Sequence, residues 1–69
     1  MMSIREVCEL LNKEGFEDVR RNDICYCRKL GLMDRPFLFG NAWGLDQRHV
    51  EQVREYLKQG RRRYRRTQQ

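Results

Sequence analysis

Long hydrophobic runs are missing from this chain of 69 residues. A membrane-spanning helix needs about 20 mostly apolar residues, and no stretch of the sequence comes near that length. No signal-peptide pattern opens the chain. We therefore expect a single small intracellular domain, cytoplasmic or nucleoid-associated, that has no membrane partner.

The sequence also lacks the residue sets of a metal centre or a catalytic site. Its three cysteines have no C-x-x-C spacing, and a zinc site would require all of them to converge with the lone His49. No phosphate-binding glycine loop, Ser/His/Asp set or functional carboxylate pair is present. We expect reduced cysteines that pack as small apolar residues, with no metal, cofactor or small-molecule effector and no enzymatic activity.

Acidic residues are absent from the C-terminal tail, and this absence determines the net charge. The chain has fifteen basic and ten acidic residues, and five of the basic ones are arginines in residues 61–69. The other ten balance the ten acids of residues 1–60, so the body of the chain is formally neutral. This pattern favours a shaped domain with a basic arm over a surface that binds any polyanion.

Two helices are predicted in the first half of the chain. Ser3 and Glu6 form a capping box, and apolar residues at helical spacing continue the first helix to about Lys13. Glu17 or Asp18 is expected to cap a second helix that ends at a glycine. The predicted buried stripe of this second helix is Val19, Ile24, Cys27 and Leu30, with Leu32 and Met33 entering the core after Gly31.

The only proline, Pro36, ends the helical pattern and introduces a predicted hairpin. Residues 37–39 and 42–43 flank Gly40-Asn41, which suits a two-residue hairpin turn. Phe37 and Phe39 share a face of this hairpin, and we expect one or both to enter the core. Trp43 is expected to close the core rather than contact a ligand.

A third helix follows, with Asp46 as its N-cap and a hydrophobic staple between Leu45 and Val50. His49 is predicted to be a surface residue of its first turn, and Gly60 to end it. Its predicted core stripe is Val50, Val53 and Leu57, with Tyr56 beside them. The expected fold is mainly α with a small β-hairpin wing, a three-helix winged helix-turn-helix domain over residues 1–59 with a disordered tail over residues 60–69.

Candidate contacts to DNA bases gather where the second helix begins. Arg20, Arg21 and Asn22 lie in its first turns, away from the apolar stripe. The first residues of a recognition helix reach base edges in helix-turn-helix proteins, and arginine and asparagine suit guanine and adenine. The alternative is that all three are ordinary solvated surface residues.

The segment Asp23–Met33 resembles the T-L-R-Y-Y-E-R-L-G-L-L stretch of MerR-type DNA-binding domains, and the likeness extends over about residues 3–58. The chain is too short for an effector domain and is more similar to excisionase-like members. The resemblance implies a phosphate contact for Tyr26, while Cys25 replaces an arginine of the family. The matching residues are Ile24, Tyr26, Leu30, Gly31 and Leu32.

The leading hypothesis is a transcriptional regulator or excisionase-like factor that binds double-stranded DNA, with several copies side by side where binding is tight. The other expected phosphate contacts are Arg28, Lys29, Arg35, Arg61, Arg62, Arg63, Arg65 and Arg66. The alternatives are a winged-helix protein-interaction module, whose hairpin docks a partner, and an RNA-binding protein led by the arginine tail.

Overall fold

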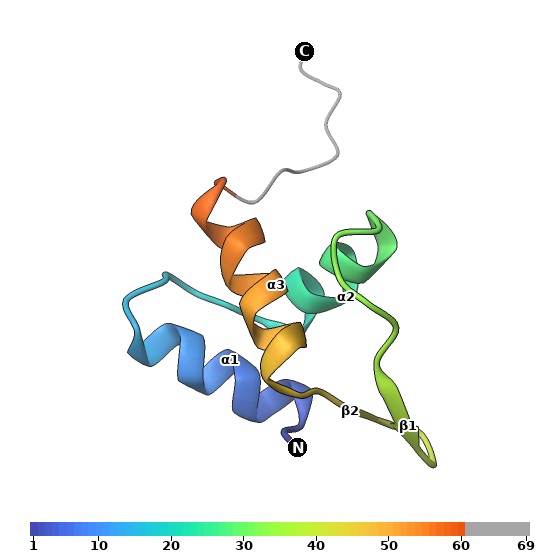
Figure 1. Cartoon of the computed structure of the whole chain (residues 1–69). Coiled ribbons are helices and arrows are strands. Elements are labelled where there is room, and N and C mark those ends of the chain that lie inside the picture. Colours follow the sequence, from blue (N-terminus) through green and yellow to red (C-terminus); the bar gives the residue numbers. More distant parts are fainter. Residues whose placement is uncertain (61–69) are drawn as a thin grey trace.

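The computed structural model describes residues 1–60, which form three helices and one hairpin (Figure 1). The elements are α1 (Ile4–Lys13), α2 (Arg21–Lys29), β1 (Phe37–Phe39), β2 (Ala42–Gly44) and α3 (Gln47–Lys58). The predicted fold class is confirmed, because a mainly helical chain with a small antiparallel hairpin has the layout of a winged helix-turn-helix. The predicted tail lies outside the described residues apart from Gly60.

No helix within residues 1–60 has both the length and the apolar character that crossing a membrane requires.

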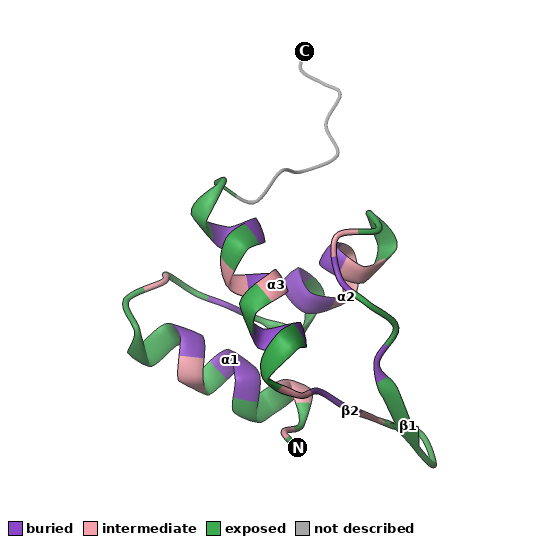
Figure 2. Ribbon diagram, in the orientation of Figure 1, coloured by how far each residue is buried: buried purple, intermediate pink, exposed green. Residues whose placement is uncertain are grey.

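The core lies where the three helices face one another. Figure 2 shows buried segments on the facing sides of α1, α2 and α3, whereas the hairpin is largely exposed. The six largest fully buried side chains are Val7, Leu11, Ile24, Cys27, Leu45 and Val53. The predicted stripe of α3 is confirmed, because Val50, Val53 and Leu57 are buried, as is Tyr56 beside them. The apolar residues at helical spacing in α1 also face the core: Val7, Cys8 and Leu11 are buried, and Ile4 and Leu10 pack against the core from its edge.

The predicted stripe of α2 is wrong at its last member. Leu30 is the C-cap of α2 and is 38% exposed. The chain reverses at Gly31, whose φ of 78° is a conformation that glycine adopts without a Cβ clash. After this reversal Met33 is buried in the core and Leu32 packs against it, as predicted.

The start of α2 also differs from the prediction, which placed the cap at Glu17 or Asp18. Asp18 has a φ of 53°, which lies outside helical geometry, and the N-cap is Arg20. The carboxylate Oδ2 of Asp23, at the third helical position, accepts a hydrogen bond from the backbone N–H of Arg20 at 2.9 Å. A carboxylate there also suits the positive end of the helix dipole.

The side chain of Asn12 explains why Val19 is not helical. Its Nδ2 donates to the Val19 carbonyl at 3.1 Å, and its Oδ1 accepts from the Val19 N–H at 2.8 Å. Both backbone groups of the buried Val19 are therefore bound to α1 and cannot join a helical ladder. The turn between α1 and α2 is fixed by this pair of bonds.

Arg54 and Glu14 add a second tie between distant parts of the chain. The guanidinium of Arg54 donates to both carboxylate oxygens of Glu14, at 2.9 and 2.8 Å. This bidentate pair joins α3 to the end of α1. The same hydrogen bonds hold the pKa of Glu14 below its ordinary value.

The hairpin confirms the predicted turn but corrects the prediction for its phenylalanines. Leu38 lies opposite Trp43, and Gly40 in the turn has a φ of 62°. Phe37 and Phe39 are 46% and 61% exposed, so neither enters the core. Trp43 packs against the core from its edge, as expected. The strands project away from the helices, and only the end of β2 reaches the interior (Figure 2).

The Asn12→Ala substitution should lower the free energy of unfolding by about 2 kcal/mol, because it leaves the two Val19 backbone groups without their partners. The neighbouring Lys13→Ala substitution is the control and should change stability by less than about 0.5 kcal/mol. Urea denaturation followed by circular dichroism measures both. Equal stability of the two variants would show that the Asn12 bonds do not hold the turn.

Candidate nucleic-acid interface

The exposed side of α2 carries cations at helical spacing. Ile24 and Cys27 are buried in the core, so the opposite side of the helix faces solvent. Arg21 and Lys29 lie on that exposed side, eight residues apart. Arg28 is half-buried at its edge. One side of this short helix therefore holds the fold together, and the other presents positive charge.

Most cations of α1 and α3 are held in ion pairs, whereas those of α2 are not. The pairs are Arg5–Glu9, Arg20–Asp18, Arg48–Asp34 and Arg54–Glu14, with separations from 2.8 to 3.4 Å. Within residues 1–60, the cations outside any such pair are Lys13, Arg21, Arg28, Lys29, Arg35 and Lys58. Four of these six lie on α2 or at the base of the hairpin, so the neutral body has one locally positive region.

The three predicted base-contacting residues are placed differently from one another. Arg21 and Asn22 are exposed in the first turn of α2. Arg20 is the N-cap, and its Nε lies 2.8 Å from Asp18 Oδ1, which raises the pKa of the guanidinium. The pair is well exposed and is readily exchanged for another anion. Arg21 and Asn22 are thus the better placed candidates.

Two other α2 side chains have mixed surroundings. Tyr26, predicted to contact phosphate, is half-buried and packs against the core, so only part of it faces outward. Cys25 is half-buried on the cationic side.

By contrast, Cys8 and Cys27 are buried, and burial raises the pKa of both thiols, that of Cys27 to about 11. These two cysteines are neutral and pack as apolar residues, as the sequence predicted.

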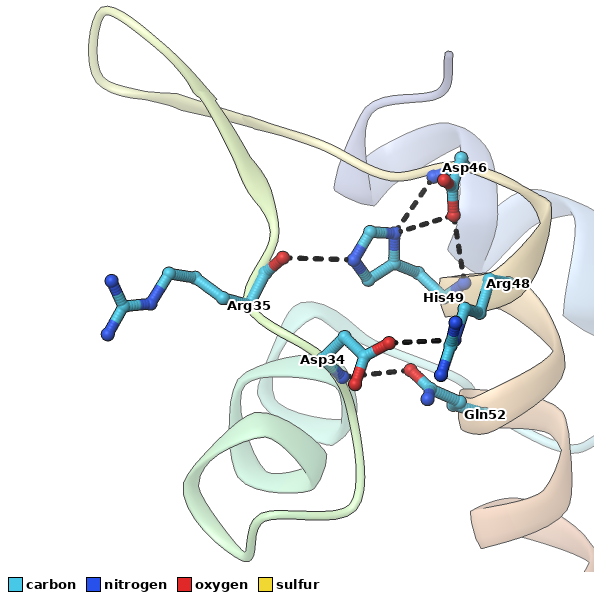
Figure 3. Close-up of polar contacts among 6 residues, drawn as sticks. All are labelled: Asp34, Arg35, Asp46, Arg48, His49 and Gln52. Carbon is cyan, nitrogen blue, oxygen red and sulfur yellow. Dashed lines mark hydrogen bonds and ion pairs between the residues drawn. The ribbon is translucent and has the colours of Figure 1, made fainter.

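The His49 prediction is wrong: this side chain is buried, with 3% exposed. Its Nε2 lies 3.1 Å from the carbonyl oxygen of Arg35, and the backbone N–H of Asp46 donates to its Nδ1 at 3.0 Å (Figure 3). The imidazole and the Phe37 ring also pack in a T-shaped arrangement, with their centroids 5.7 Å apart. His49 therefore joins the start of α3 to the base of the hairpin. Its place three residues after the N-cap, where a capping-box partner stands, was a signal for the bond to Asp46 but not for the contact with Arg35.

Two further bonds fix the connection between α2 and β1. The Asp34 backbone N–H donates to Gln52 Oε1 at 2.8 Å, and the Asp34 carboxylate pairs with Arg48 at 2.8 Å. In Figure 3 both partners come from α3, and the side chain of Arg35 projects away from that helix. The exposed cation at the hairpin base is thus carried on an anchored backbone.

Comparison of the chain with models of protein families, with curated proteins and with solved structures finds no match. Within residues 1–60, no group of three or more His, Cys, Asp and Glu side chains is placed to hold a metal ion. The geometry of α2, the hairpin and their anchoring contacts is therefore the basis for assigning a function.

The Asp46→Asn variant should lose less of its free energy of unfolding at acid pH than the wild type does. The pKa of Asp46 is lowered, first by the hydrogen bond from the His49 backbone N–H and also by the nearby imidazole. A carboxyl group whose pKa is lowered by folding contributes its full stabilisation above the unfolded pKa of about 3.9. That contribution is lost as the pH falls through the lower folded value.

Asparagine is as good an N-cap as aspartate but does not titrate. Urea denaturation from pH 6 to pH 2 should therefore show the wild type losing its advantage over Asp46→Asn below about pH 4. A constant difference between the two proteins across this range would contradict the assigned role of the carboxylate.

Proposed function

We propose that this protein binds double-stranded DNA as a small winged helix-turn-helix factor, a transcriptional regulator or an excisionase-like architectural protein. The observation that carries the proposal is the distribution of unpaired cations. Arg21, Arg28 and Lys29 on α2, with Arg35 at the hairpin base, form a positive region on a body that has no net charge overall. This role implies a nucleoid-associated location.

In the proposed complex, α2 lies in the major groove with its first turn toward the base edges. Arg21 suits guanine and Asn22 suits adenine. Arg20 exchanges its exposed pair with Asp18 for a contact to the DNA. The dipole of α2 adds to the attraction between phosphates and its first turn.

The phosphate contacts position the protein and do not read sequence. Arg28 and Lys29 in the last turn of α2 and Arg35 at the hairpin base take this role, with the outward part of Tyr26 beside them. The arginines of residues 61–69 add affinity through counterion release, in the adjacent minor groove. Because one copy covers little DNA, further copies side by side would raise affinity and selectivity.

The hairpin favours a second candidate function, a protein-interaction module. Phe37, Leu38 and Phe39 are large apolar residues that are all well exposed, and clustered exposed apolar residues mark interaction surfaces. RNA binding through the arginine tail is a third candidate. Duplex DNA and single-stranded RNA titrated in parallel at low salt distinguish the three, since the interaction module alone would bind neither.

The double substitution Arg28→Ala/Lys29→Ala should weaken binding to duplex DNA and reduce its dependence on salt. The slope of log K against log salt is negative, and each lost phosphate contact reduces its magnitude by about 0.9. Each lost contact also weakens binding roughly tenfold at about 0.1 M salt. Fluorescence anisotropy with a labelled duplex, repeated across salt concentrations, measures both quantities.

Lys13→Ala is the matched control, since Lys13 is also an unpaired cation among the described residues. It ends α1, and that end lies on the other side of the molecule from α2 in Figure 1. We expect Lys13→Ala to leave the slope unchanged. If removal of residues 61–69 abolished binding while the α2 substitutions had no effect, α2 would not be the DNA-binding helix.

A further inference from the structure

The strand β1 forms one edge of the two-stranded sheet and carries three exposed apolar side chains. Phe37 is 46% exposed, Leu38 67% and Phe39 61%. Among residues 1–60 the only strand that pairs with β1 is β2, and the hairpin projects away from the helices (Figure 2). Clustered apolar side chains of this kind mark a surface that meets a partner. The outer edge of β1 is therefore open to another chain.

The register of the hairpin shows which main-chain groups of β1 face outward. Phe39 and Ala42 flank the two-residue turn and form a hydrogen-bonded pair. Such pairs alternate along an antiparallel ladder, so Phe37 and Gly44 form the next one. Leu38 stands between them, and its N–H and C=O point away from β2. An edge strand with outward main-chain groups is a template for pairing with an added strand.

The opposite edge of the sheet is already occupied beyond β2. The backbone N–H and C=O of Leu45 pair with those of Met2, both at 2.8 Å. Leu45 follows Gly44, so its main-chain groups point to the side opposite β1, as the alternation requires. A strand that joins the sheet therefore finds the free edge at β1.

The sequence of β1 suits pairing with a second copy of itself. Phe37-Leu38-Phe39 reads the same in both directions, so an antiparallel pair centred on Leu38 places leucine opposite leucine and phenylalanine opposite phenylalanine. Residues 36–45 carry no charge, whereas many natural edge strands are protected by lysine. In this register Arg35 lies opposite Asn41 of the second copy, so the two arginines do not meet.

The two phenylalanines share one face of β1 and are held in place before any partner arrives. The Phe37 ring packs against the His49 imidazole in a T-shaped arrangement. The Phe39 ring lies over Gly44, where an added Cβ would come within 2.5 Å of it. Because these contacts already restrict both rings, less side-chain freedom is lost when a partner binds.

We propose that β1 pairs antiparallel with β1 of a second copy about a two-fold axis at Leu38, forming a four-stranded sheet across the dimer. The N–H and C=O of each Leu38 exchange hydrogen bonds with those of the other, and four phenylalanine rings meet on one face. Pro36 has no N–H and keeps the paired stretch short. The two β2 strands stay on the outside, so the assembly closes at two copies. This pairing does not depend on DNA binding.

An apolar hollow on the same molecule defines the rival outcome. It has a volume of about 400 Å³ and is lined by apolar side chains of the N-terminus, α1 and α3 and by Asp46 and Arg54. Both charged groups already have partners within the chain, His49 and Glu14. A hairpin docked there would bury the Leu38 N–H and C=O without partners, which costs free energy. Pairing with a second β1 satisfies both groups.

Sedimentation equilibrium without DNA tests the association. Three side chains from each copy are far fewer than the about 20–30 residues of a standard interface, so we expect a dissociation constant of roughly 0.1 mM. Leu38→Lys should raise it at least about tenfold, because like charges then stand opposite each other. Leu30→Lys makes the same change at an exposed leucine outside the hairpin, and this matched control should leave the constant unaltered.

NMR on a mixture of isotope-labelled and unlabelled wild type, well above that concentration, shows which surfaces meet. Contacts between Phe37 of one copy and Phe39 of the other support the paired strands. Contacts from these phenylalanines to Leu10 of the other copy would show docking in the hollow and overturn the proposal. A wild type that stays monomeric, or a Leu38→Lys variant that associates equally, would also overturn it. None of these results bears on the proposed DNA binding, so the two proposals fail separately.

Discussion

Burial of one side of α2 is the constraint on which the rest of the structure depends. This helix has only nine residues, and its contribution to the core comes chiefly from Ile24 and Cys27. A helix this short is marginal by itself in water. It therefore relies on Asn12, which fixes the preceding turn, and on the reversal at Gly31, after which Met33 enters the core. Arg21, Asn22 and Lys29 remain exposed on the rest of the helix.

Ion pairs and hydrogen bonds of the acidic residues add to this difference between the buried and the exposed side of α2. The acids of the body are used to hold elements together: Glu14 binds Arg54, Asp34 binds Arg48, and Asp23 caps α2. These acids are not available to neutralise the exposed side of α2. A body with no net charge thus presents a positive surface in one place, which is the basis of the proposed DNA contact.

The sequence predicted the elements well where local chemistry decides them. The Ser3–Glu6 capping box, the turn at Gly40 and the cap at Asp46 depend on neighbouring residues, and the structure has all three. The predictions that were wrong are ones that needed the tertiary arrangement. The start of α2 depends on Asn12 reaching across the turn to residue 19, which no capping rule anticipates.

The wrong predictions for His49, Phe37 and Phe39 have the same cause, because the burial of these residues depends on contacts between distant parts of the chain. Nothing local says that the imidazole is buried, because its partner is a carbonyl fourteen residues earlier. The exposure of Phe37 and Phe39 likewise depends on the hairpin projecting from the helices rather than lying on them. Of the base candidates, Arg21 and Asn22 are exposed as expected, while the pairing of Arg20 with Asp18 was missed.

The central claim is that α2 and the hairpin base form one DNA-binding face. It is tested most directly by NMR, following the backbone amides of ¹⁵N-labelled protein as duplex DNA is added. The account predicts that the largest shift changes fall on residues 21–29 and on Arg35, with small changes on the outer side of α1 around Arg5 and Glu9. Changes centred on α1, or absent from both α2 and the hairpin base, would contradict it.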